Sequence, residues 1–326
     1  MTLAQIVEHR RRERIETGPA GMVWIEGGTF TMGSDRHYPE EGPAHLVTVE
    51  GFVIDRFPVT NSEFARFVED TGYITLAERA PDPADYPGAK PEMLAPSSVV
   101  FRKPQGPVDL RNHFNWWSYV PGANWRHPLG PRTSLNGRAT HPVVHVAFED
   151  AEAYAHWAGK ELPTEAEWEF AARGGLEGAE FAWGEEMMPD GRLMANTWQG
   201  EFPWQNLQCN GYEGTSPVGL FPPNGYGLFD LIGNVWEWTS DWYGARHRVA
   251  DSCCEGIYTP RGGEREASID PCQPDPAIPR KVMKGGSYLC APNYCRRYRP
   301  AARMAQPIDT STCHLGFRCV VRKPAH

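Results

Sequence analysis

The chain has 326 residues, of which 40% are hydrophobic and 22% are charged, so we expect a globular core in one large domain or two ordinary ones. A net charge of -9 and an isoelectric point of about 5.7 argue against a nucleic-acid-binding protein, which usually shows a basic patch. No stretch approaches the roughly 20 consecutive apolar residues that span a membrane.

Residues 1–21 are predicted to form a short leader, helical or frayed, ahead of a single domain over residues 22–326. The leader carries a charged cluster at residues 10–14, but the apolar run that a secretory signal requires does not follow it. Neither an internal repeat nor a sharp change in composition divides the rest of the chain. We therefore expect one domain in a cytoplasmic protein.

The first predicted elements are strands. Residues 22–33 predict a hairpin that turns at a Gly-Gly pair, Gly27 and Gly28. The segment HLVTVEGFVIDRFPVT predicts a second strand region. Before Gly51 the apolar residues stand at odd positions and after it at even positions, so we expect a bulge or a bend at this glycine.

Three helices follow, over residues 61–71, over residues 150–158 and in the segment LPTEAEWEFAARGG. The first and third begin with a capping-box pattern, in which a Thr is followed three residues later by a Glu. Glycines that can end a helix follow all three: Gly72, Gly159 and Gly174. Residues 80–140 and 176–225 have no clear period and are rich in tryptophan and proline, which favours a fold with little regular structure.

Cysteines gather near the C-terminus. Those of the chain are Cys209, Cys253, Cys254, Cys272, Cys290, Cys295, Cys313 and Cys319. Two thiolates such as those of Cys290 and Cys295 could bind a soft ion like Cu(I), and Arg296, Arg297 and Arg299 would help to keep nearby thiols deprotonated. On spacing alone a structural disulfide ranks ahead of a metal site, because CxxxxC is not a zinc-ribbon spacing, and two free thiols are a further alternative.

The motifs of this chain resemble those of the formylglycine-generating enzymes, also called sulfatase-modifying factors, over about residues 22–322. The matching segments include GGTFTMGSD, GANWRHPLGP, LPTEAEWEFAARGG, ANTWQGEFP, GNVWEWTSDWY and GGSYLCAPNYCRRYRPAAR. LPTEAEWEFAARGG and GNVWEWTSDWY also occur in relatives with other functions, whereas the cysteine pair in GGSYLCAPNYC points to formylglycine formation. The resemblance implies an α+β fold, a variant of the C-type lectin fold with low regular secondary structure.

By this resemblance the protein is an oxidase. Cys290 and Cys295 would hold Cu(I) as a linear bis-thiolate, and O2 would oxidise a cysteine in a C-x-P-x-R-like motif of an unfolded or extended sulfatase polypeptide to Cα-formylglycine. The substrate cysteine would add a third sulfur. A metal is needed because ground-state O2 reacts poorly with closed-shell organic groups. A monomer is the simplest expectation for a protein that must admit another chain.

Three further residues match positions near the active site of this family. Ser287 could hydrogen-bond an oxygen species or the substrate, although a turn serine would also follow two glycines. Trp236 matches a pocket tryptophan beside the copper, and its alternative is an ordinary core aromatic. His314 stands where many members have asparagine, so it could hydrogen-bond or titrate near neutrality.

The resemblance also implies two structural Ca²⁺ sites. One comprises Asn196, Thr197, Asn210 and Tyr212, and the other comprises Asp230, Gly233, Val235 and Glu237. Backbone carbonyls serve at several of these positions, as calcium permits. Asn210 replaces an aspartate of the family pattern, and the lost charge should weaken the first site. Without the resemblance, Asp230 and Glu237 would be interpreted as surface carboxylates.

Secreted relatives place cysteines where this chain has Ala155 and Pro300, so Cys319 lacks its usual partner. This difference is typical of a reducing compartment and favours a cytoplasmic bacterial enzyme. The remaining cysteines have no assigned role and are expected to be free thiols.

Other functions remain open at this point. A non-haem iron sulfoxide synthase of the ergothioneine type shares this domain, but it carries an additional helical domain with iron-binding histidines, and only the short leader is expected here. A lectin-like binding module would not need both cysteines. The target could also be a protein other than a sulfatase. Trp116, Trp117, Trp125 and Arg126 either line a groove for an extended peptide or hold together a loop-rich core.

Overall fold

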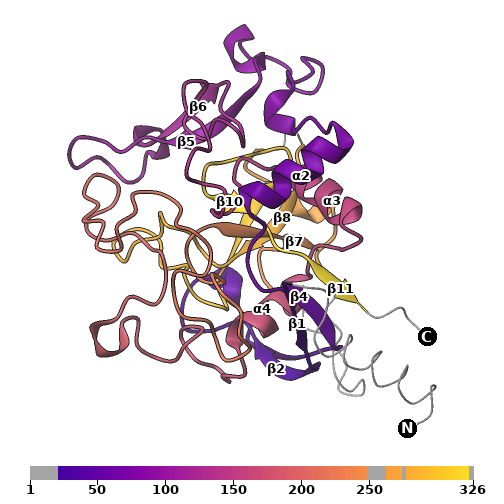
Figure 1. Cartoon of the computed structure of the whole chain (residues 1–326), viewed down its shortest axis with the longest axis vertical. Coiled ribbons are helices and arrows are strands. Elements are labelled where there is room, and N and C mark those ends of the chain that lie inside the picture. Colours follow the sequence, from indigo (N-terminus) through magenta and orange to yellow (C-terminus); the bar gives the residue numbers. More distant parts are fainter. Residues whose placement is uncertain (1–20, 248–261, 274–276, 323–326) are drawn as a thin grey trace.

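The computed structural model describes residues 21–247, 262–273 and 277–322. The predicted leader and the pair Cys253 and Cys254 lie outside the described residues. Within these ranges the chain forms three α-helices and eleven short β-strands joined by long irregular connections (Figure 1). This arrangement confirms the predicted α+β class with little regular structure. Of the helices described, none is both long and apolar enough to cross a membrane.

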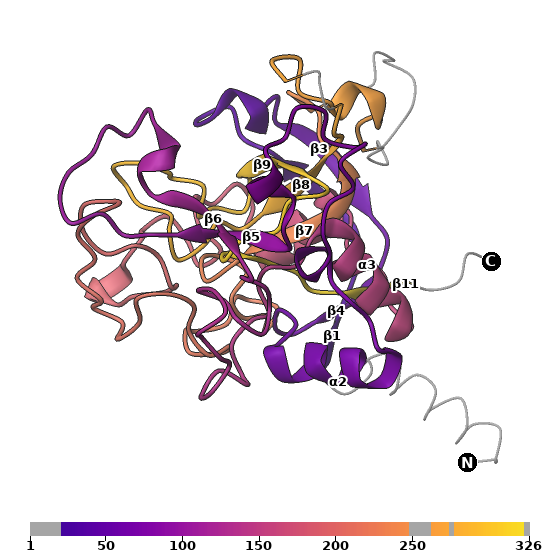
Figure 2. The ribbon, with the colours of Figure 1, turned by 90° about the horizontal axis from the view of Figure 1, so that it is seen from above.

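The largest sheet has four strands in the order β10 (Leu315–Gly316), β7 (Trp236–Trp242), β8 (Arg280–Lys284) and β9 (Arg303–Pro307). The β7–β8 and β8–β9 pairs are antiparallel, and the short β10 runs parallel to β7. Two views at right angles both place β7 and β8 near the middle of the molecule (Figures 1 and 2). The segment that follows β8 therefore starts in the interior.

The other sheets are small. β4 (Phe52–Asp55) lies between β1 (Met22–Ile25) and β11 (Val320–Arg322), so the two ends of the described chain meet on one strand. Two antiparallel pairs complete the set, namely β2 (Gly28–Met32) with β3 (His45–Val49) and β5 (Ser97–Phe101) with β6 (Trp117–Pro121).

All three predicted helices are present. α2 (Asn61–Thr71) has the predicted bounds and capping box, and Gly72 ends it in the left-handed region with a φ of 67°. α3 (Phe148–Trp157) begins two residues earlier than predicted, because the Asp150 carboxylate accepts a hydrogen bond from the Ala147 N–H at 2.8 Å. Short 3-10 turns lie at Pro39–Glu41, Leu76–Glu78, Pro91–Leu94, His113–Asn115, Pro189–Gly191 and Glu266–Ser268.

α4 (Glu165–Arg173) begins at the predicted capping box and is buried on every side. It contacts β2, β3, β7 and β8, so it lies between sheets instead of on the surface. Its charged side chains therefore need buried partners.

The predicted hairpin over residues 22–33 is wrong. β1 and β2 follow one another in the sequence, but β1 pairs with β4 and β2 pairs with β3. At Gly27 the chain crosses from one sheet to the other, and a Cβ there would lie 2.4 Å from the Val49 carbonyl oxygen. The glycine reflects this close approach of backbones and not a two-residue turn. At Gly51, where a bulge or a bend was expected, the chain passes from β3 in one sheet to β4 in another.

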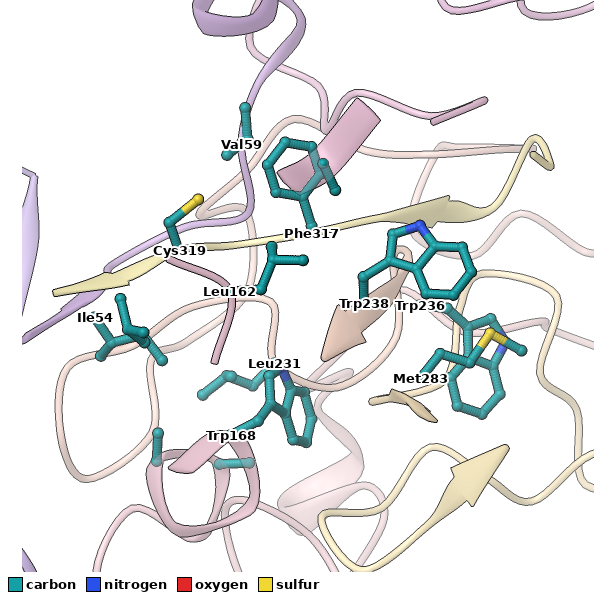
Figure 3. Packing of buried hydrophobic residues seen from close by; sticks show 14 of the residues in the cluster. Ile54, Val59, Leu162, Trp168, Leu231, Trp236, Trp238, Met283, Phe317 and Cys319 are labelled. Carbon is teal, nitrogen blue, oxygen red and sulfur yellow. The ribbon is translucent and has the colours of Figure 1, made fainter. Parts of the chain in front are cut away.

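The main core joins side chains from most of these elements. Figure 3 shows Trp168 of α4, Trp238 of β7 and Met283 of β8 among the aliphatic and aromatic residues of this cluster. Cys290 and Cys295 belong to the same core. A second cluster, here called the tryptophan cluster, packs beside them and consists of Trp116, Trp198, Phe202, Tyr288, Leu289 and Ala291.

Candidate active site

Two glycines shape the segment that carries both cysteines. After β8 ends at Lys284, Gly285 and Gly286 adopt φ values of 92° and 73°, which side chains rarely permit. A Cβ at Gly286 would also lie 2.9 Å from the Arg297 carbonyl oxygen. The two glycines therefore let the chain turn sharply and let residues 297 and 298 approach it closely, whereas the hydrogen bond from the Cys295 N–H to the Ala291 carbonyl closes the loop between the two cysteines.

The two sulfur atoms lie 3.4 Å apart and are not bonded, since a disulfide would bring them to about 2.0 Å. Their residues are only 2% and 8% exposed. Hydrogen bonds from the Cys290 N–H to the Ser287 carbonyl and from the Cys295 N–H to the Ala291 carbonyl fix the backbone around them. The disulfide that spacing alone favoured is not present in this structure.

The two thiols differ in acidity. Burial raises the pKa of Cys290 well above its usual value. The pKa of Cys295 falls to about 6, first through the hydrogen bond with Cys290 and then, against the effect of burial, through the backbone N–H and the guanidinium of Arg297. One thiolate that accepts a hydrogen bond from one thiol is therefore the favoured state. Two facing sulfurs, one of them readily ionised, are a donor set that fits Cu(I).

Ser287 lies directly beside Cys290. Its backbone N–H donates to the Cys290 sulfur at 3.4 Å, and its hydroxyl oxygen accepts from the Leu289 N–H at 3.2 Å. The serine is completely buried. The structure thus has the turn that was the alternative for this residue, and among the described residues the Ser287 hydroxyl makes no hydrogen bond as a donor.

Trp236 and His314 are joined through the backbone, because the Trp236 N–H donates to the His314 carbonyl at 2.8 Å. Trp236 is a core residue in the same cluster as the cysteines (Figure 3). The His314 ring lies 4.9 Å from the Trp117 ring, and its Nδ1 is 2.9 Å from the Thr312 hydroxyl. Burial lowers the pKa of His314 to about 3, so the ring stays neutral near pH 7.

The residues predicted for the first calcium site lie together. Asn210 Nδ2 donates to Asn196 Oδ1 at 2.8 Å, and Asn210 Oδ1 accepts from the Tyr212 N–H. Thr197 follows Asn196 and is also buried. Both amide oxygens are therefore occupied by N–H groups within the loop. A cation there would need Asn210 to turn its oxygen toward Asn196.

The second predicted calcium set contains two buried carboxylates, and other groups of the protein already contact both. The Asp230 carboxylate is buried and accepts from the Gly219 N–H at 2.7 Å, and burial raises its pKa to about 6. The Glu237 carboxylate is held by Arg318 and by the Trp168 indole. The Glu237 side chain is thus already neutralised by Arg318.

One residue that the sequence did not point to connects the two sets. Asn234 Nδ2 donates to Asp230 Oδ1 at 3.3 Å, and Asn234 Oδ1 accepts from Asn196 Nδ2 and from the Ser216 N–H. Asn234 has a φ of 57°, a conformation in which asparagine is enriched among non-glycine residues. The Gly-Asn dipeptide in LIGNVWEW is the signal that could have indicated it.

The tryptophan-rich segment over residues 116–126 mostly contributes to packing. Trp116 and Trp125 are buried, and Trp117 packs against the His314 ring. Arg126 stacks over Trp125 with its carbon 4.3 Å from the ring centroid, and it forms an ion pair with Glu78. These contacts match the alternative of a loop-rich core for Trp116 and Trp125. The six described cysteines are all free: Cys209, Cys272, Cys290, Cys295, Cys313 and Cys319.

Comparison with known proteins identifies the family. Residues 8–323 match the model of the sulfatase-modifying factor enzyme 1-like domain. A Mycobacterium tuberculosis relative named formylglycine-generating enzyme is 53% identical and covers 92% of this chain and 97% of its own. A Mus musculus relative named inactive C-alpha-formylglycine-generating enzyme 2 is 38% identical, with 94% of this chain and 88% of its own covered.

Among solved structures, PvdO from Pseudomonas aeruginosa superposes with a TM-score of 0.59 at 23% identity and covers 92% of this chain and 93% of its own. This likeness concerns the fold alone. Together with the family match it confirms the predicted variant of the C-type lectin fold. The chain therefore belongs to the sulfatase-modifying factor family of formylglycine-generating enzymes and their relatives.

Proposed function

We propose that this protein converts a cysteine in a C-x-P-x-R-type motif of a sulfatase polypeptide to Cα-formylglycine, with Cu(I) at Cys290 and Cys295 and with O2 as the acceptor. Membership of the family does not carry this proposal by itself, because the family includes a relative named as inactive. The observation that carries it is the pair of unbonded, buried sulfurs 3.4 Å apart.

Each part of the chain has a task in this scheme. Cu(I) bound at the two sulfurs would supply the O2 chemistry that side chains lack. Cys290 and Cys295 would hold the ion, and the hydrogen bond from the Cys295 N–H to the Ala291 carbonyl fixes the loop between them. The tryptophan cluster packs beside Cys290, because Leu289 and Ala291 flank this cysteine and the Trp198 N–H donates to its carbonyl at 3.0 Å. The Ser287 hydroxyl, which makes no hydrogen bond as a donor among the described residues, would donate a hydrogen bond to an oxygen atom beside Cys290.

We infer further that the substrate binds as an unfolded or extended segment to a monomeric enzyme in the cytoplasm. Unpaired thiols at all six described cysteines and the lack of a cysteine at positions 155 and 300 support a reducing compartment. Bound Ca²⁺ would be structural, at the two asparagine-linked sets described above. A lectin-like binding module is the rival, and it gives no reason for two facing thiols.

The decisive experiment combines a peptide substrate with cysteine variants. Purified protein is incubated with Cu(I), a reductant and air, together with a short peptide that contains CTPSR. Mass spectrometry follows the loss of about 18 Da that accompanies conversion of a thiol to an aldehyde. Cys290→Ala and Cys295→Ala should abolish conversion, whereas Cys319→Ala removes an equally buried thiol away from the pair and should keep it.

Each outcome has a clear meaning. Conversion that depends on copper and on both cysteines would establish the reaction and the metal site together. Copper binding without conversion of the peptide would overturn the substrate assignment. If copper does not bind and the two cysteines form a stable disulfide in solution, the binding module replaces the enzyme as the better interpretation.

A further inference from the structure

A cavity of about 230 Å³ lies where the start of α2, the end of β5 and the loop at Tyr288 meet. Neither cysteine of the proposed copper site lines this cavity, and Ser287 does not line it either. Its volume is just below the roughly 300–1,000 Å³ of pockets that hold drug-sized ligands. The cavity therefore has room for a smaller molecule, at a place to which the proposed reaction gives no task.

Part of the cavity wall is apolar. Phe101, Leu129, Leu135 and Val144 all line it, and Val144 is buried. Ligand pockets are typically lined by such side chains, with a few polar groups that fix the orientation of the ligand. A bound molecule would therefore have an apolar part.

The rest of the lining carries an excess of positive charge. Arg102, Lys103 and Arg138 line the cavity, and Glu213 is the one carboxylate among the described residues that line it. Lys103 Nζ lies 2.7 Å from a Glu213 oxygen, so the charges of these two residues balance. Arg102 donates to an uncharged group, the Leu129 carbonyl, at 3.0 Å. Two guanidinium groups thus face the cavity without a carboxylate of the lining to balance them, which favours an anionic ligand.

Arg138 is the better placed of these two arginines. Its backbone is fixed, because its carbonyl accepts from Asn61 Nδ2 at 2.8 Å and from the His141 N–H at 3.1 Å. Its side chain is half-buried, and no hydrogen bond or ion pair joins the guanidinium to another described residue. A guanidinium can donate two parallel hydrogen bonds to one carboxylate. Arg138 is therefore available to bind the carboxylate of a ligand.

Asn61 adds an acceptor to the wall of the same cavity. This residue is 4% exposed, and its Oδ1 atom is buried without a hydrogen-bond partner in the described part of the chain. The bond from Nδ2 to the Arg138 carbonyl fixes which side of the amide carries the oxygen. A buried acceptor without a donor is costly, so the hydroxyl of a bound molecule would fit there. An ammonium group is a poorer donor in this place, because the lining already carries excess positive charge.

We propose that this cavity binds a small hydroxy acid with an apolar side chain. The carboxylate lies at Arg138 and Arg102, the hydroxyl donates to Asn61 Oδ1, and the apolar part packs against Leu135 and Val144. The site is separate from the cysteine pair. It goes beyond the proposed function, and binding needs no copper.

The test is an NMR titration of the copper-free full chain at low salt with three related probes. Phenyllactate has all three recognised groups and should bind. Phenylpropionate lacks the hydroxyl and should bind about fivefold more weakly, and phenylethanol lacks the carboxylate and should bind at least about tenfold more weakly. Equal affinities for phenyllactate and phenylethanol would show that the cavity recognises only apolar groups and would overturn the inference. The absence of phenyllactate binding at millimolar concentrations would overturn it as well.

Three variants assign the contacts to residues. Arg138→Gln should weaken phenyllactate binding at least about tenfold, because the charged partner of the carboxylate is lost. Arg132→Gln is the matched control, since it removes an exposed arginine of the same loop that does not line the cavity, and it should change the affinity less than twofold. In Asn61→Ala, phenyllactate and phenylpropionate should bind equally well, because the acceptor for the hydroxyl is gone.

Equal weakening in Arg132→Gln and Arg138→Gln would overturn the inference, because general charge and not position would then matter. A preference for the hydroxyl that survives in Asn61→Ala would contradict the contact with Asn61. Melting curves check that each variant is folded, and the comparison of the three probes on the unaltered protein does not depend on any variant. Because copper and peptide conversion play no part in this titration, failure of the proposed function would leave its result unchanged.

Discussion

Arg318 and Glu237 form an ion pair that lies wholly inside the protein. Arg318 Nε and Nη2 lie 2.7 and 2.8 Å from the two Glu237 oxygens, and the Trp168 indole donates to the same carboxylate at 2.7 Å. Arg318 also donates to the backbone carbonyls of Asp55 and Phe229. The pair therefore ties β7 to α4 and to the sheet that contains both ends of the described chain.

Removing the charge of Glu237 should be strongly destabilising. Glu237→Gln leaves the Arg318 charge buried without a partner, so the free energy of unfolding should fall by about 3–5 kcal/mol in urea titrations. Glu161→Gln breaks the exposed pair with Arg322 and should cost at most about 1 kcal/mol. The loss in Glu237→Gln should be the same with calcium or with EDTA. A loss that disappears in EDTA would mean that the carboxylate itself binds calcium.

The first proposed calcium site should bind calcium more tightly when a negative charge is placed at position 210. Asn210→Asp removes the N–H that now donates to Asn196 and places a carboxylate beside that amide oxygen. Calcium affinity should rise about tenfold or more, because the ion gains a charged ligand. The difference in melting temperature between calcium and EDTA reports this gain. Asn206→Asp, in the same loop but outside the predicted ligand set, is the control, and an equal gain there would contradict a specific site.

The buried carboxylate of Glu169 should make the protein sensitive to acid. Its oxygens accept from Arg173, from Lys284 and from the Gly33 N–H. Burial alone would raise the pKa of Glu169, but Lys284 and Arg173 lower it to about 2. Because the folded pKa lies below the ordinary value of 4.5, this stabilisation is complete above about pH 4.5 and is lost as the pH falls toward 2.

Unfolding free energies at several pH values test this expectation. The unaltered protein should lose up to about 3 kcal/mol through Glu169 between pH 4.5 and 2. Glu169→Gln is less stable at neutral pH, but its stability should fall less steeply over that range because the titrating group is gone. Parallel pH profiles for the two proteins would show that Glu169 does not carry the effect.

Local signals predicted the helices but not the sheets. Capping boxes such as Thr60 with Glu63 act within one turn of chain, so the sequence around α2 was sufficient to place it. β1 instead pairs with β4, which also pairs with β11 from the other end of the chain. Alternating residues cannot show which distant strand lies beside them, and the wrong hairpin over residues 22–33 follows from this limit.

The candidate site, like the fold, could be predicted from the sequence only in part. The cysteine pair was recognisable from its surrounding motif, although spacing alone pointed to a disulfide. The three arginines after Cys295 looked equivalent in sequence, but the structure gives each a different partner. Arg299 meets Glu41 and Arg297 meets Glu40, more than 250 residues away along the chain, and such pairing has no local signal.

Cys319 should accept a disulfide if a partner is supplied. Ala155 of α3 and Cys319 are both buried in the main core, and the Glu161 N–H donates to the Val320 carbonyl, which joins the end of that helix to the strand after Cys319. Ala155→Cys restores the cysteine that secreted relatives carry in this helix. Under oxidising conditions it should form a bond with Cys319 and raise stability by about 2–4 kcal/mol, because the closed loop is long.

Thiol counting and melting curves with and without dithiothreitol test this design. The oxidised variant should have two fewer free thiols than the reduced one, and the reductant should reverse its gain in melting temperature. Ala151→Cys introduces the same side chain one turn earlier in the core and should remain reduced. If the thiol introduced by Ala155→Cys and that of Cys319 both stay free under conditions that oxidise exposed thiols, helix α3 does not present position 155 to Cys319. The lack of a cysteine at that position would then not account for the free thiol of Cys319.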